Sequence, residues 1–151
     1  MKTSTIVLLA ILAALALAGT GGAILMNTRG FRNKNPGNLK GNVAWLGRVG
    51  TDPQGFAIFE SMEMGVRAIR VDLTAKLNRG VDTVRKIISV YAPSIENPTE
   101  NYIRKVSEWS GVSPDQKLTA ANLPAIVDSI IRFENGGALQ AAVIKAGLAL
   151  A

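Results

Sequence analysis

The chain lacks cysteine and histidine altogether over its 151 residues. Without cysteine, a disulfide framework and thiolate metal sites are excluded. Without histidine, histidine-dependent catalytic triads, histidine zinc sites and histidine pH switches are excluded as well. Any acid–base chemistry must therefore come from Asp, Glu, Tyr or Lys, and we expect no metal ion or other cofactor.

Acidic residues are scarcer than basic ones, with 11 Asp and Glu against 17 Lys and Arg and a formal net charge of +6. Such a balance favours an anionic partner: nucleic acid, anionic lipid or cell-wall polymer. No basic stripe along one helix and no aromatic ladder interleaved with cations is present, so we expect no specific nucleic-acid partner. The densest basic cluster follows the apolar N-terminus and consists of Arg29, Arg32, Lys34, Lys40 and Arg48.

Charged residues are missing from residues 6–26, an apolar run that as a helix would span about 31 Å and cross a bilayer. Two interpretations stay open: a signal peptide cleaved after Ala16-Leu17-Ala18, or a retained single-span anchor. We favour the anchor, because the apolar run continues past that site. The chain then divides into a membrane anchor, residues 1–27, and a domain, residues 28–151. Basic residues are commoner after the span, which by the positive-inside rule places the domain in the cytoplasm at insertion.

Turn-forming residues dominate residues 27–55, so no long helix is expected there. The short apolar pieces at residues 43–45 and 56–59 are predicted strands of a small β-lobe. Apolar residues at helical spacing predict helices over residues 61–77, 82–91, 97–111 and 123–135, with a last short helix over 138–150. The fold class is therefore mainly α, formally α+β: a helical domain with a small β-lobe.

The most informative motif is an apolar helix that ends on a carboxylate followed by two glycines, Phe133-Glu134-Asn135-Gly136-Gly137. Glycine ends the helix because it adopts the left-handed conformation without a steric penalty. Glu134 then lies in the last turn, where the negative end of the helix dipole and apolar neighbours disfavour its ionised form. These effects predict a raised pKa, which a general acid working near neutral pH requires. The structural alternative is a solvated charge at a helix end.

A series of short motifs runs in order from residue 29 to residue 137. It opens with Arg29-Gly30-Phe31-Arg32-Asn33-Lys34-Asn35-Pro36-Gly37-Asn38-Leu39, passes through Trp45-x-Gly47, Thr51-Asp52-Pro53 and Glu96-Asn97-x-Thr99-x-x-Tyr102, and closes with Phe133-Glu134-Asn135-Gly136-Gly137. This set resembles a family of phage virion proteins described as structural or lytic, by analogy with the cell-wall-degrading protein of enveloped double-stranded RNA phages. The family usually carries histidine where this chain has Phe133. If that histidine helps catalysis, this chain is a weakened or purely structural member, and that alternative stays open.

A looser similarity is to lysozyme-like glucosaminidases. Residues that look like the later part of those enzymes are Asn35-Pro36-Gly37-Asn38-Leu39-Lys40, Trp45, Phe56, Phe59 and Tyr102. The Glu-bearing helix comes first in those enzymes and last here, so a circular permutation is needed to bring Glu134 to the equivalent place, opposite the β-lobe. The resemblance implies a lysozyme-like fold.

Together the residues and the resemblances predict a membrane-anchored phage virion enzyme that cleaves the β-1,4 glycosidic bond of peptidoglycan, as a lysozyme or lytic transglycosylase. Protonated Glu134 would donate its proton to the leaving glycosidic oxygen, with Asp52 as a second carboxylate and Tyr102 bracing the sugar or the intermediate. The predicted substrate-binding residues are Asn35, Asn38, Trp45 and Glu96. Structural explanations compete, since Asp and Asn form turns and Tyr102 and Trp45 suit a core.

The expected partners are peptidoglycan strands, the lipid bilayer through residues 6–26, and other virion proteins. The domain is expected to face the virion interior or the periplasm from the virion membrane or the host inner membrane. Peptide-bond cleavage would normally need zinc or a nucleophile paired with histidine, so the composition favours the sugar bond. The competing interpretation is a non-catalytic, membrane-anchored virion protein that joins the bilayer to a coat or genome.

Overall fold

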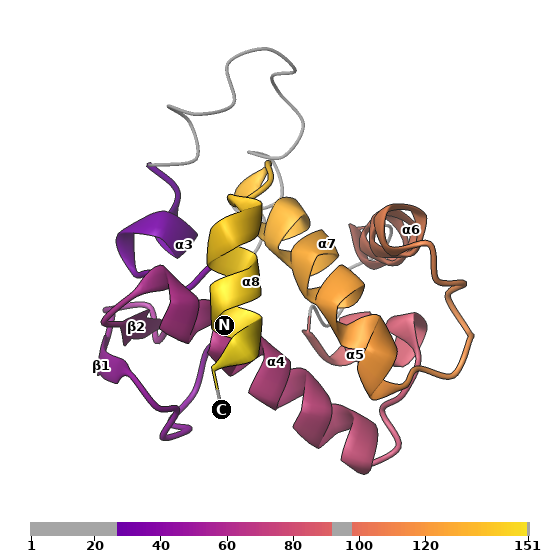
Figure 1. The fold of residues 1–151 in the computed structure, drawn as a ribbon, viewed down its shortest axis with the longest axis horizontal. Helices are drawn as coiled ribbons and strands as arrows, with labels where there is room; N and C mark the ends of the chain where they lie inside the picture. The colour runs from indigo at the N-terminus through magenta and orange to yellow at the C-terminus, as the bar shows by residue number, and fades with distance from the viewer. Residues whose placement is uncertain (1–26, 92–97, 151) are drawn as a thin grey trace, which may run out of the picture.

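A computed structural model describes residues 27–91 and 98–150. Helices dominate these two ranges, and one two-stranded antiparallel sheet accompanies them (Figure 1). The elements are α3 (Arg29–Arg32), β1 (Arg48–Thr51), β2 (Ala57–Phe59), α4 (Met62–Asn78), α5 (Val84–Tyr91), α6 (Pro98–Ser110), the 3-10 helix η2 (Ala120–Asn122), α7 (Leu123–Asn135) and α8 (Ala141–Ala149). The prediction of a mainly helical domain with a small β-lobe is confirmed.

The predicted membrane anchor, residues 1–27, lies outside the described residues except for Asn27. Within the two described ranges, no helix combines the length and the hydropathy that crossing a bilayer requires.

Helices α4 and α7 begin and end within one residue of the predicted positions. Ser61 caps α4, because its hydroxyl accepts a hydrogen bond from the Met64 N–H at 3.2 Å. Gly136 ends α7 in the left-handed conformation, with φ of 70°. This ending places Glu134 one residue before the last residue of the helix, as the sequence predicts.

The remaining helices differ from prediction only at their ends. Helix α5 starts two residues late, because the Thr83 hydroxyl accepts the Lys86 N–H at 3.1 Å and so caps the helix. Helix α6 begins at Pro98, which suits a first turn whose N–H groups have no helical partner. Helix α8 covers only residues 141–149 of the predicted 138–150.

The predicted strand at residues 43–45 is wrong, whereas β2 lies within the predicted strand at 56–59. Val43 and Ala44 are exposed, and the Trp45 N–H donates to the Val43 carbonyl at 3.0 Å in a tight turn. The Trp45 side chain is buried and packs at a tilt on Phe59, with 6.1 Å between ring centroids. This short apolar segment therefore does not pair as a strand. Its one buried side chain, Trp45, anchors the loop to the core.

The strand that does pair with β2 is β1, which is joined to it by a turn at residues 52–55. In this turn the Gly55 N–H donates to the Asp52 carbonyl at 2.9 Å. Residues 48–51 were not predicted as a strand because the exposed Val49 and the flanking Gly50 give no apolar alternation. The tight turn, and not an apolar pattern, therefore explains why residues 48–51 pair with β2.

The core is centred on α7, which lies between α6 and α8 in Figure 1 and packs on α4. Four aliphatic side chains of α7 are fully buried: Ile126, Val127, Ile130 and Ile131. Each contributes roughly 2 kcal/mol by removal from water. The C-terminal end of α7 is thereby held rigidly against its neighbours.

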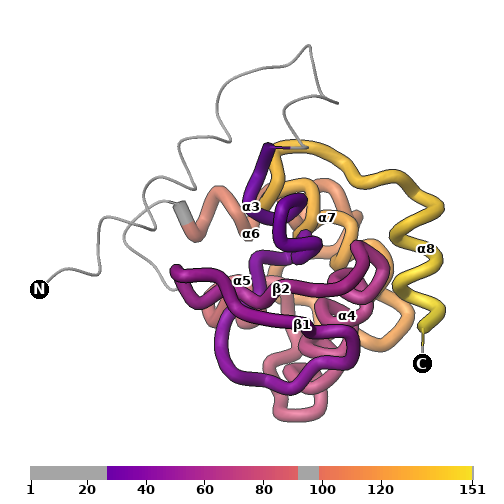
Figure 2. Tube along the Cα trace, turned by 90° about the vertical axis from the view of Figure 1, so that its left-hand side faces the viewer, coloured from indigo at the N-terminus to yellow at the C-terminus, as the bar shows by residue number. Residues whose placement is uncertain are grey.

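Residues 27–59 form α3 and the β-lobe on one side of the helical body, and this side faces the viewer in Figure 2. Two glycines let the loop at residues 33–38 approach the helices closely. A Cβ at Gly65 of α4 would lie 2.1 Å from the Lys34 carbonyl oxygen, and a Cβ at Gly30 of α3 would lie 2.2 Å from Oδ1 of Asn135. The packing at these two positions therefore leaves no room for any side chain larger than that of glycine.

Candidate functional site

The carboxyl group of Glu134 is held by side chains from two other segments. Its Oε1 accepts a hydrogen bond from the Tyr102 hydroxyl of α6 at 2.8 Å. Its Oε2 accepts one from Nδ2 of Asn38, in the loop after α3, at 2.9 Å. Residues that stand 96 and 32 positions from Glu134 in the chain thus fix the orientation of one carboxyl group.

The surroundings favour the protonated form of Glu134. Burial raises the pKa of its carboxyl group above the usual value, and the hydrogen bonds from Asn38 and Tyr102 oppose this only in part. None of the ion pairs within residues 27–91 and 98–150 includes Glu134. The residue as a whole is only half-buried. Desolvation of the carboxyl group itself is nonetheless the main cause of the raised pKa.

Two tyrosines line the surroundings of this carboxyl group. The Tyr102 ring is buried and stacks on the ring of Phe133, with 3.7 Å between centroids and 13° between planes. Tyr91, at the end of α5, donates its hydroxyl hydrogen to the Gly37 carbonyl. Burial raises the pKa of both phenols well above the usual value, and the negative charge of Glu134 adds to this effect. Both hydroxyls therefore stay protonated and remain donors.

Asn135, next to Glu134, joins α7 to the N-terminal segment. Its Nδ2 donates to the Pro36 carbonyl at 2.7 Å and to the Ile131 carbonyl at 2.8 Å, and its Oδ1 accepts the Thr28 hydroxyl at 3.1 Å. The side chain is almost fully buried. It was not predicted as a site residue, although its place in the closing Glu-Asn-Gly-Gly motif was the available signal. Tyr91 was missed too, since a helix-face tyrosine carries no signal of its own.

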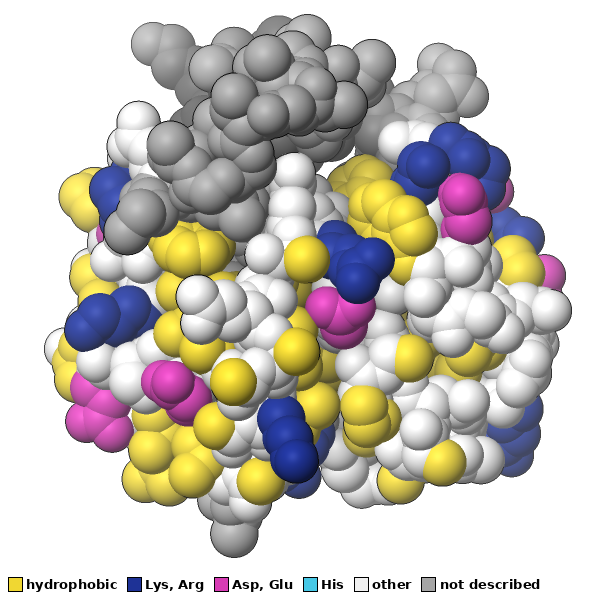
Figure 3. Space-filling view, turned by 45° about the horizontal axis from the view of Figure 1, so that its top comes forward, with side chains coloured by type: hydrophobic (Ala, Val, Ile, Leu, Met, Phe, Trp, Pro, Cys, Tyr) yellow, Lys and Arg dark blue, Asp and Glu magenta, His cyan; other side chains and the backbone are white. Residues whose placement is uncertain are grey.

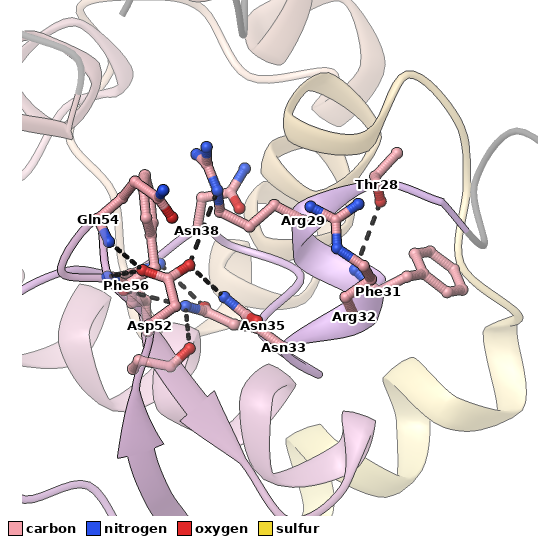
Figure 4. Close-up of polar contacts among 12 residues, drawn as sticks. Thr28, Arg29, Phe31, Arg32, Asn33, Asn35, Asn38, Asp52, Gln54 and Phe56 are labelled. Carbon is pink, nitrogen blue, oxygen red and sulfur yellow. Dashed lines mark hydrogen bonds and ion pairs between the residues drawn. The ribbon is translucent and has the colours of Figure 1, made fainter. Parts of the chain in front are cut away.

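Asp52 occupies the turn between β1 and β2, where its carboxylate is fully engaged (Figure 4). Its Oδ1 accepts the Gln54 and Phe56 N–H groups at 3.0 and 2.9 Å, and its Oδ2 accepts Nδ2 of Asn33 at 2.7 Å. Burial alone would raise the pKa of Asp52, but these hydrogen bonds and the nearby Arg29 outweigh it and hold the pKa below the usual value. The geometry assigns Asp52 a structural task, and its role as a second carboxylate stays a prediction.

Two of the predicted substrate-binding residues are committed to the fold. Asn35 is 1% exposed, and its amide bonds the Leu39 N–H and the carbonyls of Leu39 and Ala57, each at 2.9 Å. Trp45 is 8% exposed and belongs to the core. Their binding roles stay predictions that these contacts do not support. Glu96 lies outside the described residues. Asn38 is the predicted binding residue that the fold brings to Glu134.

A groove of about 490 Å³ between α7 and α8 is separate from this site. The described residues that line it include Pro124, Asp128, Arg132, Ile144 and Leu148, and neither Glu134 nor Tyr102 nor Asn38 is among them. The described residues also contain no group of three His, Cys, Asp or Glu side chains able to hold a metal ion. The side chains that hydrogen-bond the Glu134 carboxyl group among the described residues are those of Asn38 and Tyr102.

One comparison with known proteins decides the family. Protein P5 of Pseudoalteromonas phage PM2 is 37% identical to the chain over 135 residues, which cover 85% of this chain and 84% of that protein. The chain belongs to the family of PM2 protein P5. Membership of a phage protein family, the coarser part of the resemblance, is thereby confirmed. No sequence profile of a known protein family matches the chain.

The surface of this P5-family member carries its positive charge in separate places. On the face in Figure 3, Lys and Arg side chains stand apart, and Asp or Glu lies beside several of them. Ion pairs account for part of this pattern, such as Arg132 with Asp128 at 3.0 Å and Arg104 with Glu108 at 3.4 Å. That the protein has no specific nucleic-acid partner stays a prediction.

Proposed function

We propose that this P5-family protein is a membrane-anchored phage virion enzyme that cleaves the β-1,4 glycosidic bond of peptidoglycan, with Glu134 as the general acid. One observation carries the proposal: the Glu134 carboxyl group is desolvated, has no cationic partner among the described residues, and is oriented by two neutral donors. A purely structural carboxylate more often has a cationic partner or faces solvent. A carboxyl group that must stay protonated near neutral pH needs the environment that Glu134 has.

The same donors suit the charge that develops during proton transfer. As the O–H bond of Glu134 breaks and the glycosidic oxygen takes the proton, the carboxyl group becomes a carboxylate. Charge-assisted hydrogen bonds are stronger than neutral ones, so the bonds from Asn38 and Tyr102 strengthen as the C–O bond of the sugar breaks. The carboxylate can then remove a proton from the nucleophile, which is water in hydrolysis or the sugar's own 6-hydroxyl in transglycosylation.

A single-carboxylate route fits the described residues better than a two-carboxylate route, because Asp52 is engaged in its turn. Retaining and inverting glycosidases place their two carboxyl groups on either side of the scissile bond. Lytic transglycosylases manage with one. The absence of His and Cys again favours the sugar bond over the peptide bond.

The structural alternative rests on the same contacts. Glu134, Tyr102 and Asn38 link α7, α6 and the loop after α3, so this trio also stabilises the fold. Phe133 stacks on Tyr102 as a core aromatic would. If Glu134, Tyr102 and Asn38 serve only to link these segments, the protein is a non-catalytic virion component held to the bilayer by residues 6–26.

Purified full-length protein acting on isolated peptidoglycan separates the two functions. The enzyme should release glycan fragments that mass spectrometry identifies: new reducing ends after hydrolysis, or 1,6-anhydro ends after transglycosylation. Absence of both products from folded protein supports the structural alternative. Release of free stem peptides alone would refute the assignment of the sugar bond.

Replacing Asn38 with Gly should move the pH profile of lysis. Asn38 has φ of 48°, in the left-handed region, so glycine keeps the backbone conformation while removing the amide. Loss of this donor should raise the pKa of Glu134 further, which shifts the alkaline limb of the profile to higher pH. The maximal rate should fall about tenfold, because the Glu134 carboxyl group loses one of its two hydrogen-bond donors.

The matched control for Asn38 is Asn33→Ala. Asn33 lies in the same loop and likewise donates to a carboxylate, that of Asp52, at 2.7 Å. Its loss should leave the alkaline limb where it is in the wild type. If the alkaline limb of the pH profile did not move in the Asn38→Gly variant, this amide would not act on the catalytic acid.

Replacing Asp52 with Asn tests its structural role through stability at low pH. Because its pKa in the folded state is below the unfolded value, the stabilisation by Asp52 is fully present above about pH 4 and is lost as pH falls through the folded pKa. Urea unfolding between pH 2 and pH 7 should therefore show a shallower acid decline in the variant. Loss of lysis by a folded, stable variant would instead assign Asp52 the second-carboxylate role.

A further inference from the structure

Tyr91, at the end of α5, contacts the loop that presents Asn38 to Glu134. Its hydroxyl group donates a hydrogen bond to the Gly37 carbonyl oxygen. The fit at Gly37 is close, because a Cβ there would lie 2.6 Å from the Tyr91 hydroxyl oxygen and 2.6 Å from Cγ1 of Ile69. Side chains of α5 and α4 therefore both lie against the loop one residue before the amide that bonds the Glu134 carboxyl group.

The hydrogen bond from Tyr91 fixes more than one carbonyl oxygen. The Gly37 carbonyl and the Asn38 N–H belong to the same peptide group, which is planar and rigid. The Asn38 N–H donates in turn to the Asn35 carbonyl at 2.9 Å. Because both polar groups of this peptide plane are bonded, the plane cannot rotate without losing a hydrogen bond. Its orientation sets the direction in which the Asn38 side chain leaves the backbone.

The backbone of Asn38 needs such support. Its φ of 48° is in the left-handed region, which residues other than glycine adopt mainly where their surroundings hold them there. In this conformation Nδ2 of Asn38 lies 2.9 Å from Oε2 of Glu134. A freed peptide plane would let Asn38 relax to a commoner conformation and would carry its amide away from the carboxyl group.

Tyr91 is also near Glu134 in space. Burial raises the pKa of the Tyr91 phenol, and the negative charges of Glu134 and Asp72 raise it further. Tyr102 of α6 faces the same carboxyl group, and burial likewise raises the pKa of its phenol. Both phenols are therefore neutral where lysis is measured. Tyr91 acts on its surroundings as a hydrogen-bond donor and not as a charge.

A buried lysine of α4 lies against the Tyr91 ring. The Lys76 ammonium nitrogen is 5.7 Å from the ring centroid, within the range of a cation–π contact. Lys76 is 8% exposed and pairs with Asp72, one turn earlier in the helix. Neither residue has a part in the proposed reaction. Their contact with the ring helps to fix Tyr91, so α4 supports the loop through Lys76 as well as through Ile69.

We propose that Tyr91 is a positioning residue for Glu134: its hydroxyl group holds the peptide between Gly37 and Asn38 so that the Asn38 amide bonds the acid. This inference rests on the proposed function, because positioning matters to catalysis only if Glu134 is the acid. The hydroxyl group acts through Asn38 and takes no part in the proton transfer. Its removal should therefore produce a weaker form of the effect of removing the Asn38 amide.

The test uses Tyr91→Phe in the full-length protein and follows the carboxyl carbon of Glu134 by NMR as the pH is raised. The signal is assigned as the one that disappears in Glu134→Gln. Loss of the Tyr91 hydroxyl should move the titration midpoint to higher pH, because a weakened hydrogen bond from Asn38 opposes desolvation less. The maximal rate of lysis should fall about threefold, which is less than in Asn38→Gly.

A double variant shows whether Tyr91 acts through Asn38. Adding Tyr91→Phe to Asn38→Gly should move the titration midpoint no further, because the amide that the hydroxyl positions is already gone. The matched control is Thr74→Val on α4, which removes another hydroxyl that donates to a backbone carbonyl, that of Arg70 at 2.8 Å. This control should leave the midpoint where it is in the wild type.

Three results would overturn the proposal. The first is an unchanged midpoint in folded Tyr91→Phe with lower stability in urea, which would mean that the hydroxyl only stabilises the loop. The second is a further move of the midpoint in the double variant, which would mean that Tyr91 acts on Glu134 directly. The third is an equal move in Thr74→Val, which would mean that any loss of a buried hydroxyl has this effect.

A second variant covers the case in which Tyr91→Phe does not fold. Ile69→Val shortens the other side chain that lies against Gly37 and should move the midpoint in the same direction. An unmoved midpoint in this variant would overturn the proposal as well. Because the titration is read without substrate, a protein that fails to cleave peptidoglycan still decides whether Tyr91 positions the Asn38 amide.

Discussion

Glu134→Gln is expected to abolish lysis of outer-membrane-stripped cells, with a loss of at least about a hundredfold in the initial rate of turbidity decrease. Gln has the size and shape of Glu but no proton to donate at neutral pH. The Tyr102 hydroxyl can still donate to the amide oxygen of Gln. Asn38 can turn its amide so that Oδ1, which is buried and has no partner among the described residues, accepts from the new amide. The variant therefore loses the acid while keeping the contacts.

Stability provides the second readout for this variant. A carboxyl group whose pKa is raised in the folded state destabilises the protein as pH rises through that pKa, because the unfolded chain releases the proton more easily. Gln does not titrate, so Glu134→Gln should be no less stable than the wild type at pH 7 in urea unfolding. Lower activity at equal or higher stability is typical of a residue kept for function.

The matched control is Glu108→Gln on α6. Glu108 is 54% exposed and pairs with Arg104 and Lys105 at the surface, so its loss should change neither lysis nor stability measurably. If lysis persisted unchanged in folded Glu134→Gln, the role of Glu134 as the acid would be refuted, and the anchored structural protein would be the better description.

Gly65→Ala is expected to destabilise the protein by about 2 kcal/mol, against the direction that helix propensity predicts. In the interior of an ordinary exposed helix this change stabilises, by roughly 1 kcal/mol. Here the new Cβ would lie 2.1 Å from the Lys34 carbonyl oxygen and 2.6 Å from the Pro36 ring. Backbone cannot yield as a flexible side chain can, so the loop at residues 33–38 must move away from α4. Urea unfolding at 25 °C measures the difference.

The displaced loop carries Asn38, so lysis should fall together with stability in Gly65→Ala. The control is Gly50→Ala in β1, where the nearest atom to a new Cβ is Cδ1 of Ile58 at 3.7 Å, an ordinary contact. This variant should change the free energy of unfolding by less than about 0.5 kcal/mol. A Gly65→Ala variant as stable as the wild type would mean that the loop does not pack on α4 as closely as described.

Much of the helical architecture could be predicted because its signals are local. Ser61 and Gly136 are cap residues whose effects do not depend on distant parts of the chain, and α4 and α7 begin and end accordingly. The β-lobe could not be predicted as well. The turn that brings β1 beside β2 is stabilised by hydrogen bonds to the Asp52 side chain. Trp45 packs in the core against Phe59, which is distant in sequence.

The candidate site shows the same division. The carboxyl group at the end of an apolar helix could be recognised from the motif, because burial and helix position follow from neighbouring residues. Which asparagine meets Glu134 could not be known, since Asn35 and Asn38 share one motif and differ only in where the turn points them. Asn35 bonds its own lobe, whereas Asn38 faces α7.

The sequence by itself determined the chemistry available to this protein: carboxylate acid–base groups without His or Cys, a helix that ends at Glu134, and membership of a phage family. Only the tertiary structure decided which groups act on Glu134. Tyr102 and Asn38 reach it from distant parts of the chain, and Asp52 is committed to its turn. The physical reason is range: caps and periodicity act over a few residues, whereas desolvation and hydrogen bonding of a carboxyl group depend on everything packed around it.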